Sequence, residues 1–164
     1  MRANSVPGAS ALPAAGLIFT ACGSGPAHSD AGGRAPKRQS CHQMFAAWQH
    51  GPGSAAGTAV NIALSDVRSA AKSNNVSLLV SALGKLGPAA GRLSAYPIPH
   101  CADPGGYWGA LLDHMKAAGD SARSANGLRA ITLAEPALEQ VPSILTRLSS
   151  ELHRTVGLSR NAFG

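Results

Sequence analysis

The fold is decided by the stretch Tyr96-Pro97-Ile98-Pro99-His100-Cys101-Ala102-Asp103-Pro104-Gly105-Gly106-Tyr107-Trp108. Its two closely spaced prolines favour an extended connection, because a proline disfavours the helical conformation in the residue before it. Asp103 is then a favoured N-cap, and Pro104 suits the first position of a helix. The stretch therefore predicts a break between two helical halves, with a new helix starting close to Pro104.

Apolar residues recur at helical spacing on both sides of this break. Before it, turns are expected at Gly51-Pro52-Gly53, at Asn74-Asn75 and at Gly87-Pro88, with Asn75 capping the helix that follows it. After it, the last helix has Pro142 as its start or as a kink. The residues expected on the inner faces are Cys41, Met44, Phe45, Trp48, Val60, Ala63, Leu64, Val67, Ala71, Leu79, Leu83, Leu86, Trp108, Leu111, Leu112, Met115, Ala118, Leu138, Val141, Leu145, Leu148 and Leu152.

Strand-like alternation is almost absent from the chain. We therefore predict an all-α fold, a small four- or five-helix up-and-down bundle over residues 41–158, with a disordered tail at 159–164.

A short apolar run near the N-terminus ends in small residues and a cysteine: Leu17-Ile18-Phe19-Thr20-Ala21-Cys22-Gly23. The run is shorter than the about 20 apolar residues of a transmembrane helix, and Arg2 precedes it, as in a secretory signal. We predict a signal peptide at 1–21 and lipid on Cys22, which would be the mature N-terminus. The alternative interpretation is a disordered leader that contains a cysteine by chance.

Residues 22–40 are rich in Gly, Ser and Pro and show no apolar periodicity. This composition predicts a flexible tether between the lipid anchor and the domain. Arg34, Lys37 and Arg38 would then lie near anionic headgroups, to which each basic residue adds about 1 kcal/mol of attraction. A soluble linker is the alternative. The predicted location is extracytoplasmic, at the cell membrane.

If Cys22 carries lipid, Cys41 and Cys101 remain as a pair among the 3 cysteines. An oxidising compartment favours a disulfide between them, which would close a loop of about 60 residues and contribute about 4 kcal/mol to stability. A zinc site is the competing hypothesis, because His42 follows the first cysteine and His100 precedes the second. Adjacent residues are poor ligand pairs, so we favour the disulfide and predict no bound metal.

Most of the aromatic residues lie near these two cysteines in the sequence. We expect them to form the densest part of the core, and the functional alternative is an aromatic ligand groove made by Trp48, Tyr107 and Trp108. The aromatic residues concerned are Phe45, Trp48, Tyr96, Tyr107 and Trp108.

The catalytic motifs that we searched for are missing. The glycine-rich segment from Gly51 to Thr58 lacks the lysine of a phosphate loop, and the 8 acidic residues form no pair at a spacing useful for acid–base chemistry. Asp113, beside His114, is expected to be solvated. An enzyme would need a site assembled from other polar residues, so we predict a non-catalytic protein without a cofactor. The residues left for such a site are His42, His50, His100 and Asp103, with the aromatic residues.

Binding to nucleic acid is suggested by a net charge of +6 and a pI of about 9.8. Residues 66–72 with residues 76–81 resemble the helix-turn-helix of lac-type repressors, but the turn is too long and Leu78, Leu79 and Val80 stand where contacts to DNA are needed. The basic residues are spread along the chain. We therefore predict no nucleic-acid partner, and an intracellular DNA-binding protein is the least favoured hypothesis.

With the lipobox, the tether and the Ala-rich helical domain, the stretch from Tyr96 to Trp108 resembles uncharacterised small lipoproteins of high-GC Gram-positive bacteria. The resemblance covers most of the chain in layout and is specific only in this stretch. It implies a lipoprotein anchored to the cell membrane, and it carries no known activity. The leading hypothesis is a non-catalytic, tethered module that binds or positions an envelope protein or a cell-wall component.

Overall fold

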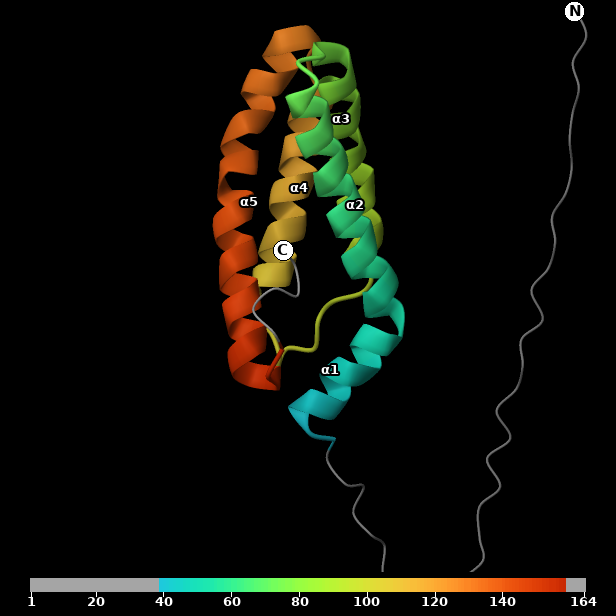
Figure 1. Cartoon of the computed structure of the whole chain (residues 1–164), viewed down its shortest axis with the longest axis vertical. Helices are drawn as coiled ribbons and strands as arrows, with labels where there is room; N and C mark the ends of the chain where they lie inside the picture. Colours follow the sequence, from blue (N-terminus) through green and yellow to red (C-terminus); the bar gives the residue numbers. More distant parts are fainter. Residues whose placement is uncertain (1–38, 159–164) are drawn as a thin grey trace, which may run out of the picture. The chain divides into compact units, whose positions relative to one another are not determined.

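The computed structural model describes residues 39–158, which form five α-helices and no β-strand (Figure 1). The all-α prediction is therefore confirmed, with five helices rather than four. The predicted signal peptide, Cys22, nearly all of the tether and the tail at 159–164 lie outside the described residues. The helices are α1 (Cys41–His50), α2 (Pro52–Lys72), α3 (Val76–Leu93), α4 (Tyr107–Arg123) and α5 (Gly127–Val156).

Helices α2 to α5 run alternately up and down, and the short helix α1 lies at one end of this arrangement (Figure 1). The turns that join α2 to α3 and α4 to α5 lie at the opposite end from α1. Helix α4 packs against α3 and α5, whereas α2 packs against α3 and α1. The connection between α3 and α4, residues 94–106, lies at the same end as α1 and the last turn of α5.

The core contains most of the apolar residues that the helical spacing placed on inner faces. Near the end of α2 Ala70 is buried and Ala71 is exposed, so that prediction was wrong by one residue. Small residues bring α3 and α4 together, because Gly87 of α3 lies directly against Gly119 of α4. The largest fully buried side chains are Leu83, Leu86, Leu111, Met115, Leu148, Leu152 and Val60.

Gly87-Pro88 does not interrupt the chain as predicted, because α3 continues through it to Leu93. A proline inside a helix leaves the carbonyl four residues earlier without its usual N–H donor. Here that carbonyl belongs to Gly84, and Nη1 of Arg123 in α4 donates a hydrogen bond to it at 3.3 Å. A side chain from the neighbouring helix therefore replaces the bond that Pro88 removes.

The starts of α4 and α5 also differ from the prediction. Helix α4 begins at Tyr107, three residues after Pro104, and its N-cap is Gly106 in the left-handed conformation with φ of 67°. Helix α5 begins at Gly127 and contains Pro142 in its interior, so Pro142 is not its start. By contrast, Asn75 caps α3 as predicted, since its side chain accepts a hydrogen bond from the Leu78 N–H at 3.1 Å.

Among the described residues, no helix combines enough length with enough apolar character to span a membrane.

Candidate functional site

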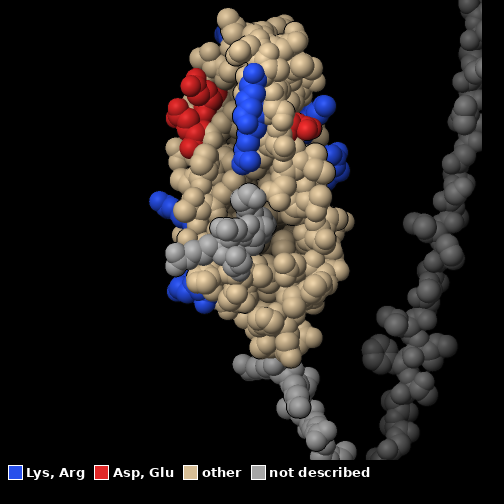
Figure 2. Space-filling model, in the orientation of Figure 1, with Lys and Arg blue, Asp and Glu red and all other residues tan. Residues whose placement is uncertain are grey.

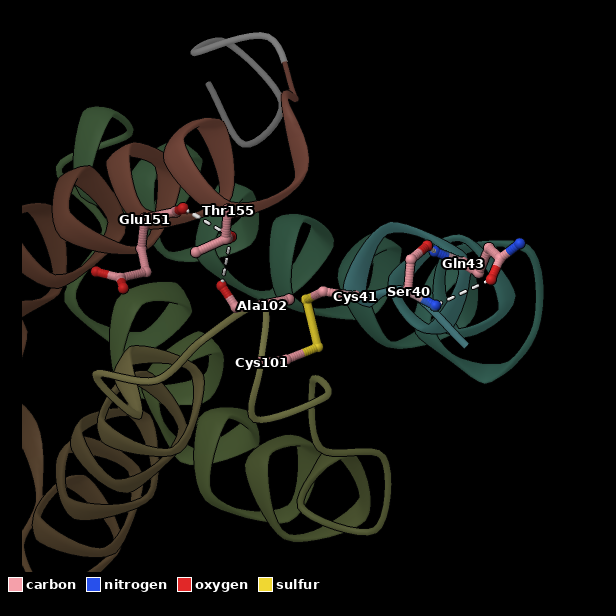
Figure 3. Close-up of a disulfide and its surroundings, with 7 residues drawn as sticks. All are labelled: Ser40, Cys41, Gln43, Cys101, Ala102, Glu151 and Thr155. Atoms are coloured by element: carbon pink, nitrogen blue, oxygen red, sulfur yellow. Dashed lines mark hydrogen bonds between the residues drawn. A yellow bond between two sulfur atoms is a disulfide. The ribbon is translucent and has the colours of Figure 1, made fainter. Parts of the chain in front are cut away.

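A disulfide joins the first residue of α1 to the connection between α3 and α4 (Figure 3). It links Cys41 to Cys101, whose Cα atoms are 5.7 Å apart, within the usual range for a disulfide. The pairing predicted from the cysteine count is therefore confirmed. The bond fixes the point at which the chain enters the bundle.

Helix α1 begins directly at Cys41 because Ser40 supplies a complete capping box. The Ser40 hydroxyl accepts a hydrogen bond from the Gln43 N–H at 3.2 Å, and the Gln43 side chain accepts one from the Ser40 N–H at 2.9 Å. Two otherwise unpaired N–H groups are satisfied in this way. The capping box at Ser40 and the disulfide at Cys41 therefore hold two adjacent residues at the point where the chain enters the bundle.

Two further contacts hold the connection between α3 and α4 against the rest of the domain. Thr155 of α5 places its hydroxyl 2.9 Å from the Ala102 carbonyl and 2.8 Å from the Glu151 carbonyl, so both oxygens share one donor (Figure 3). The indole N–H of Trp48 in α1 donates to the Tyr96 carbonyl at 3.2 Å. Helices α1 and α5 thus both contact this connection, which the sequence alone did not indicate.

Asp103 caps α4 from outside the helix. The residue is only 4% exposed, and its two carboxylate oxygens accept hydrogen bonds from the N–H groups of Tyr107 and Trp108 at 2.9 and 2.8 Å. The carboxylate also lies at the positive end of the helix dipole, where negative charge is stabilising. Asp103 was predicted as the N-cap, but that position is held by Gly106; Pro104 and Gly105 form a turn from which the Asp103 side chain still reaches the first N–H groups of the helix.

We expect Asp103→Ala to lower the free energy of unfolding by about 2 kcal/mol, because it removes a charged acceptor from two N–H groups at the start of α4, one of them in a buried hydrogen bond. Asp103→Asn keeps one acceptor oxygen, so it should lose about half as much. Urea denaturation followed by circular dichroism measures both. Equal stability of Asp103→Ala and the unmodified chain would contradict the capping role.

Three of the five aromatic residues near the two cysteines in the sequence, Phe45, Trp48 and Trp108, are buried in the core, whereas Tyr96 is exposed, so the prediction was wrong for Tyr96. The rings of Phe45 and Trp48 stack with centroids 5.5 Å apart, and Trp48 meets Trp108 edge to face at 5.8 Å. Trp48 and Trp108 are buried, and Tyr107 is half-buried. The two indole rings border separate cavities rather than one groove. Within residues 39–158, the Trp108 indole N–H has no acceptor.

The histidines of the zinc and enzyme hypotheses lie at the surface. His42, His50 and His100 are all exposed, and the two sulfur atoms of the zinc hypothesis are bonded to each other. No group of three or more His, Cys, Asp or Glu side chains that would hold a metal ion occurs in the described part of the chain. Both oxygens of Asp103 are engaged by backbone N–H groups, so that carboxylate serves as a helix cap.

A pocket of about 360 Å³ lies between the α3–α4 connection and the first turns of α4. We call it the connector pocket. Asp113 is exposed, as predicted, and it lies four residues after Gly109, so the two residues share a helix face. That spacing was the available signal. The pocket is lined by Ser94, Pro97, Ile98, His100, Asp103, Gly106, Trp108, Gly109, Leu112 and Asp113.

The positive charge of the chain is concentrated outside the described domain. Residues 39–158 contain nine Lys and Arg against seven Asp and Glu, so this part carries a net charge of only +2. Figure 2 shows basic side chains at several separate positions on one face, with acidic side chains on the same face. A nucleic-acid interface needs a clustered basic surface, which this face does not present.

Comparison of the chain with protein-family models, with curated proteins and with solved structures gives no match.

Proposed function

We propose that this protein is a non-catalytic, extracytoplasmic lipoprotein whose helical domain binds or positions a component of the cell envelope. The observation that carries the proposal is the Cys41–Cys101 disulfide, because stable disulfides are typical of oxidising compartments outside the cytoplasm. The lipobox-like run that ends at Cys22 supplies the anchor in this proposal.

The arrangement of the domain supports a positioning role. The chain enters the bundle at Ser40 and Cys41, at the end that holds the disulfide, and the capping box fixes the backbone at that point. The turns between α2 and α3 and between α4 and α5 lie at the opposite end (Figure 1). An anchored chain would therefore attach to the domain at one defined end.

Replacing Cys22 with Ala is expected to move the protein from the membrane fraction to the soluble fraction, because the proposed lipid attaches to this thiol. Intact mass of the native protein should show a chain that starts at a lipidated Cys22. Cell fractionation followed by immunoblotting measures the shift. The matched control is Cys41→Ala, which leaves the lipobox unchanged and should stay with the membrane.

An unprocessed chain that begins at Met1 and stays in the cytoplasm would overturn the lipoprotein proposal. Salt-sensitive binding to DNA by such a chain would then favour the intracellular alternative.

A further inference from the structure

We propose that the connector pocket binds a small organic cation, a primary ammonium group carried on a short apolar body. This inference deepens the proposed function, on which it rests, by naming the chemistry of the envelope component that the domain would recognise. The volume of about 360 Å³ lies at the lower end of the about 300–1,000 Å³ usual for ligand pockets. The pocket therefore suits a small ligand or the end of a side chain.

One wall of the pocket is a face of α4 made by Gly109, Leu112 and Asp113, which are spaced three and four residues apart. A Cβ atom added at Gly109 would meet nothing within 4 Å. The missing side chain thus leaves open space one helical turn before the Asp113 carboxylate. Across the pocket, Pro97 and Ile98 of the connection supply apolar surface.

The charges that line the pocket favour a cation. Asp103 and Asp113 both line it, no Lys or Arg does, and His100 is the one other ionisable side chain of the lining. Asp103 already accepts two backbone hydrogen bonds, so its charge is compensated within the fold. Asp113 has no hydrogen-bond or ion-pair partner among the described residues. Asp120, further along the same helix, is paired with Lys116 and Arg123.

The start of α4 would normally favour an anion, because N-terminal N–H groups carry partial positive charge. In this protein the Asp103 carboxylate occupies the Tyr107 and Trp108 N–H groups. The helix dipole at the pocket is therefore already offset by a carboxylate. The unpaired charge that remains at the wall is the negative charge of Asp113, next to apolar surface that would contact the body of the ligand.

The test uses the full chain with Cys22→Ser, which prevents lipidation, and three probes of similar shape: benzylammonium, benzyl alcohol and benzoate. Titrations followed by amide NMR should show benzylammonium shifting the signals of Gly109 and Asp113, with Kd on the order of 1 mM for so small a ligand. Benzoate should shift neither signal. Equal binding of benzoate and benzylammonium would overturn the proposal.

Two pairs of variants locate the site. Gly109→Phe fills the pocket and should weaken benzylammonium binding more than about tenfold, whereas Gly91→Phe, at another helical glycine with open space around it, should leave it unchanged. Asp113→Asn should weaken binding about threefold, as expected for a partly exposed ion pair, and Asp120→Asn should not. Unchanged binding by Asp113→Asn, which alters no packing, overturns the proposal even if Gly109→Phe misfolds.

The two proposals fail in different ways. If only the pocket proposal is wrong, the titrations show no selective binding of benzylammonium, while the native chain is still found in the membrane fraction through Cys22. If the lipoprotein proposal is wrong, intact mass shows an unprocessed chain and fractionation places it in the cytoplasm, whatever the titrations show.

Discussion

The double variant Cys41→Ser/Cys101→Ser is expected to lose about 4 kcal/mol of its free energy of unfolding, because the disulfide spans 60 residues and a loop of that length restricts the unfolded chain strongly. Small domains are stable by only about 5–15 kcal/mol, so the loss would be a large share of the total. Aromatic residues make up only 4% of the chain, so burial of large aromatic side chains adds little stability that could offset the loss of the disulfide.

Guanidinium denaturation of the double variant and of the unmodified chain, followed by circular dichroism at 222 nm, measures this loss. Reduction of the unmodified chain should reproduce the result, because it opens the same loop without changing a residue. Cys22→Ser is the matched control: it removes a thiol that is not part of the pair and should leave the free energy of unfolding unchanged. A loss below about 1 kcal/mol would show that the bond does not stabilise the fold.

Helices were predictable where local spacing alone determines burial. The stripe of Trp108, Leu111, Leu112 and Met115 is buried as expected, because residues three and four apart share a face of any regular helix. Pro88 misled the prediction because its missing hydrogen bond is replaced through Arg123, which is 39 residues away from Gly84. A tertiary contact of this kind leaves no trace in the local pattern.

The candidate site was predictable only in part, for the same reason. The cysteine count identified the disulfide, since only two thiols remained to pair once Cys22 was set aside. The Thr155 hydroxyl, which lies 2.9 Å from Ala102 across 53 residues, was not predictable from any motif. The connector pocket likewise depends on the fold, because its walls come from α4 and from the separate connection at Pro97 and Ile98.

Gly119→Ala is the second substitution with a large expected effect, and we expect it to lower the free energy of unfolding by about 3 kcal/mol. A Cβ atom at this position would lie 2.3 Å from the Gly87 nitrogen, 2.9 Å from its Cα and 3.2 Å from the Leu83 carbonyl oxygen. All three are backbone atoms, so no side-chain rotation relieves the overlap. Helices α3 and α4 would have to separate, and the buried contacts between them would loosen.

Gly91→Ala is the matched control, because it adds the same methyl group to a helix where nothing lies within 4 Å of the new Cβ. Alanine is a better helix former than glycine by about 1 kcal/mol, so this variant should be at least as stable as the unmodified chain. Urea denaturation of the three proteins side by side separates the two effects. If Gly119→Ala matched Gly91→Ala in stability, close approach of α3 and α4 at Gly87 would not be needed for the fold, and the expected loss would be wrong.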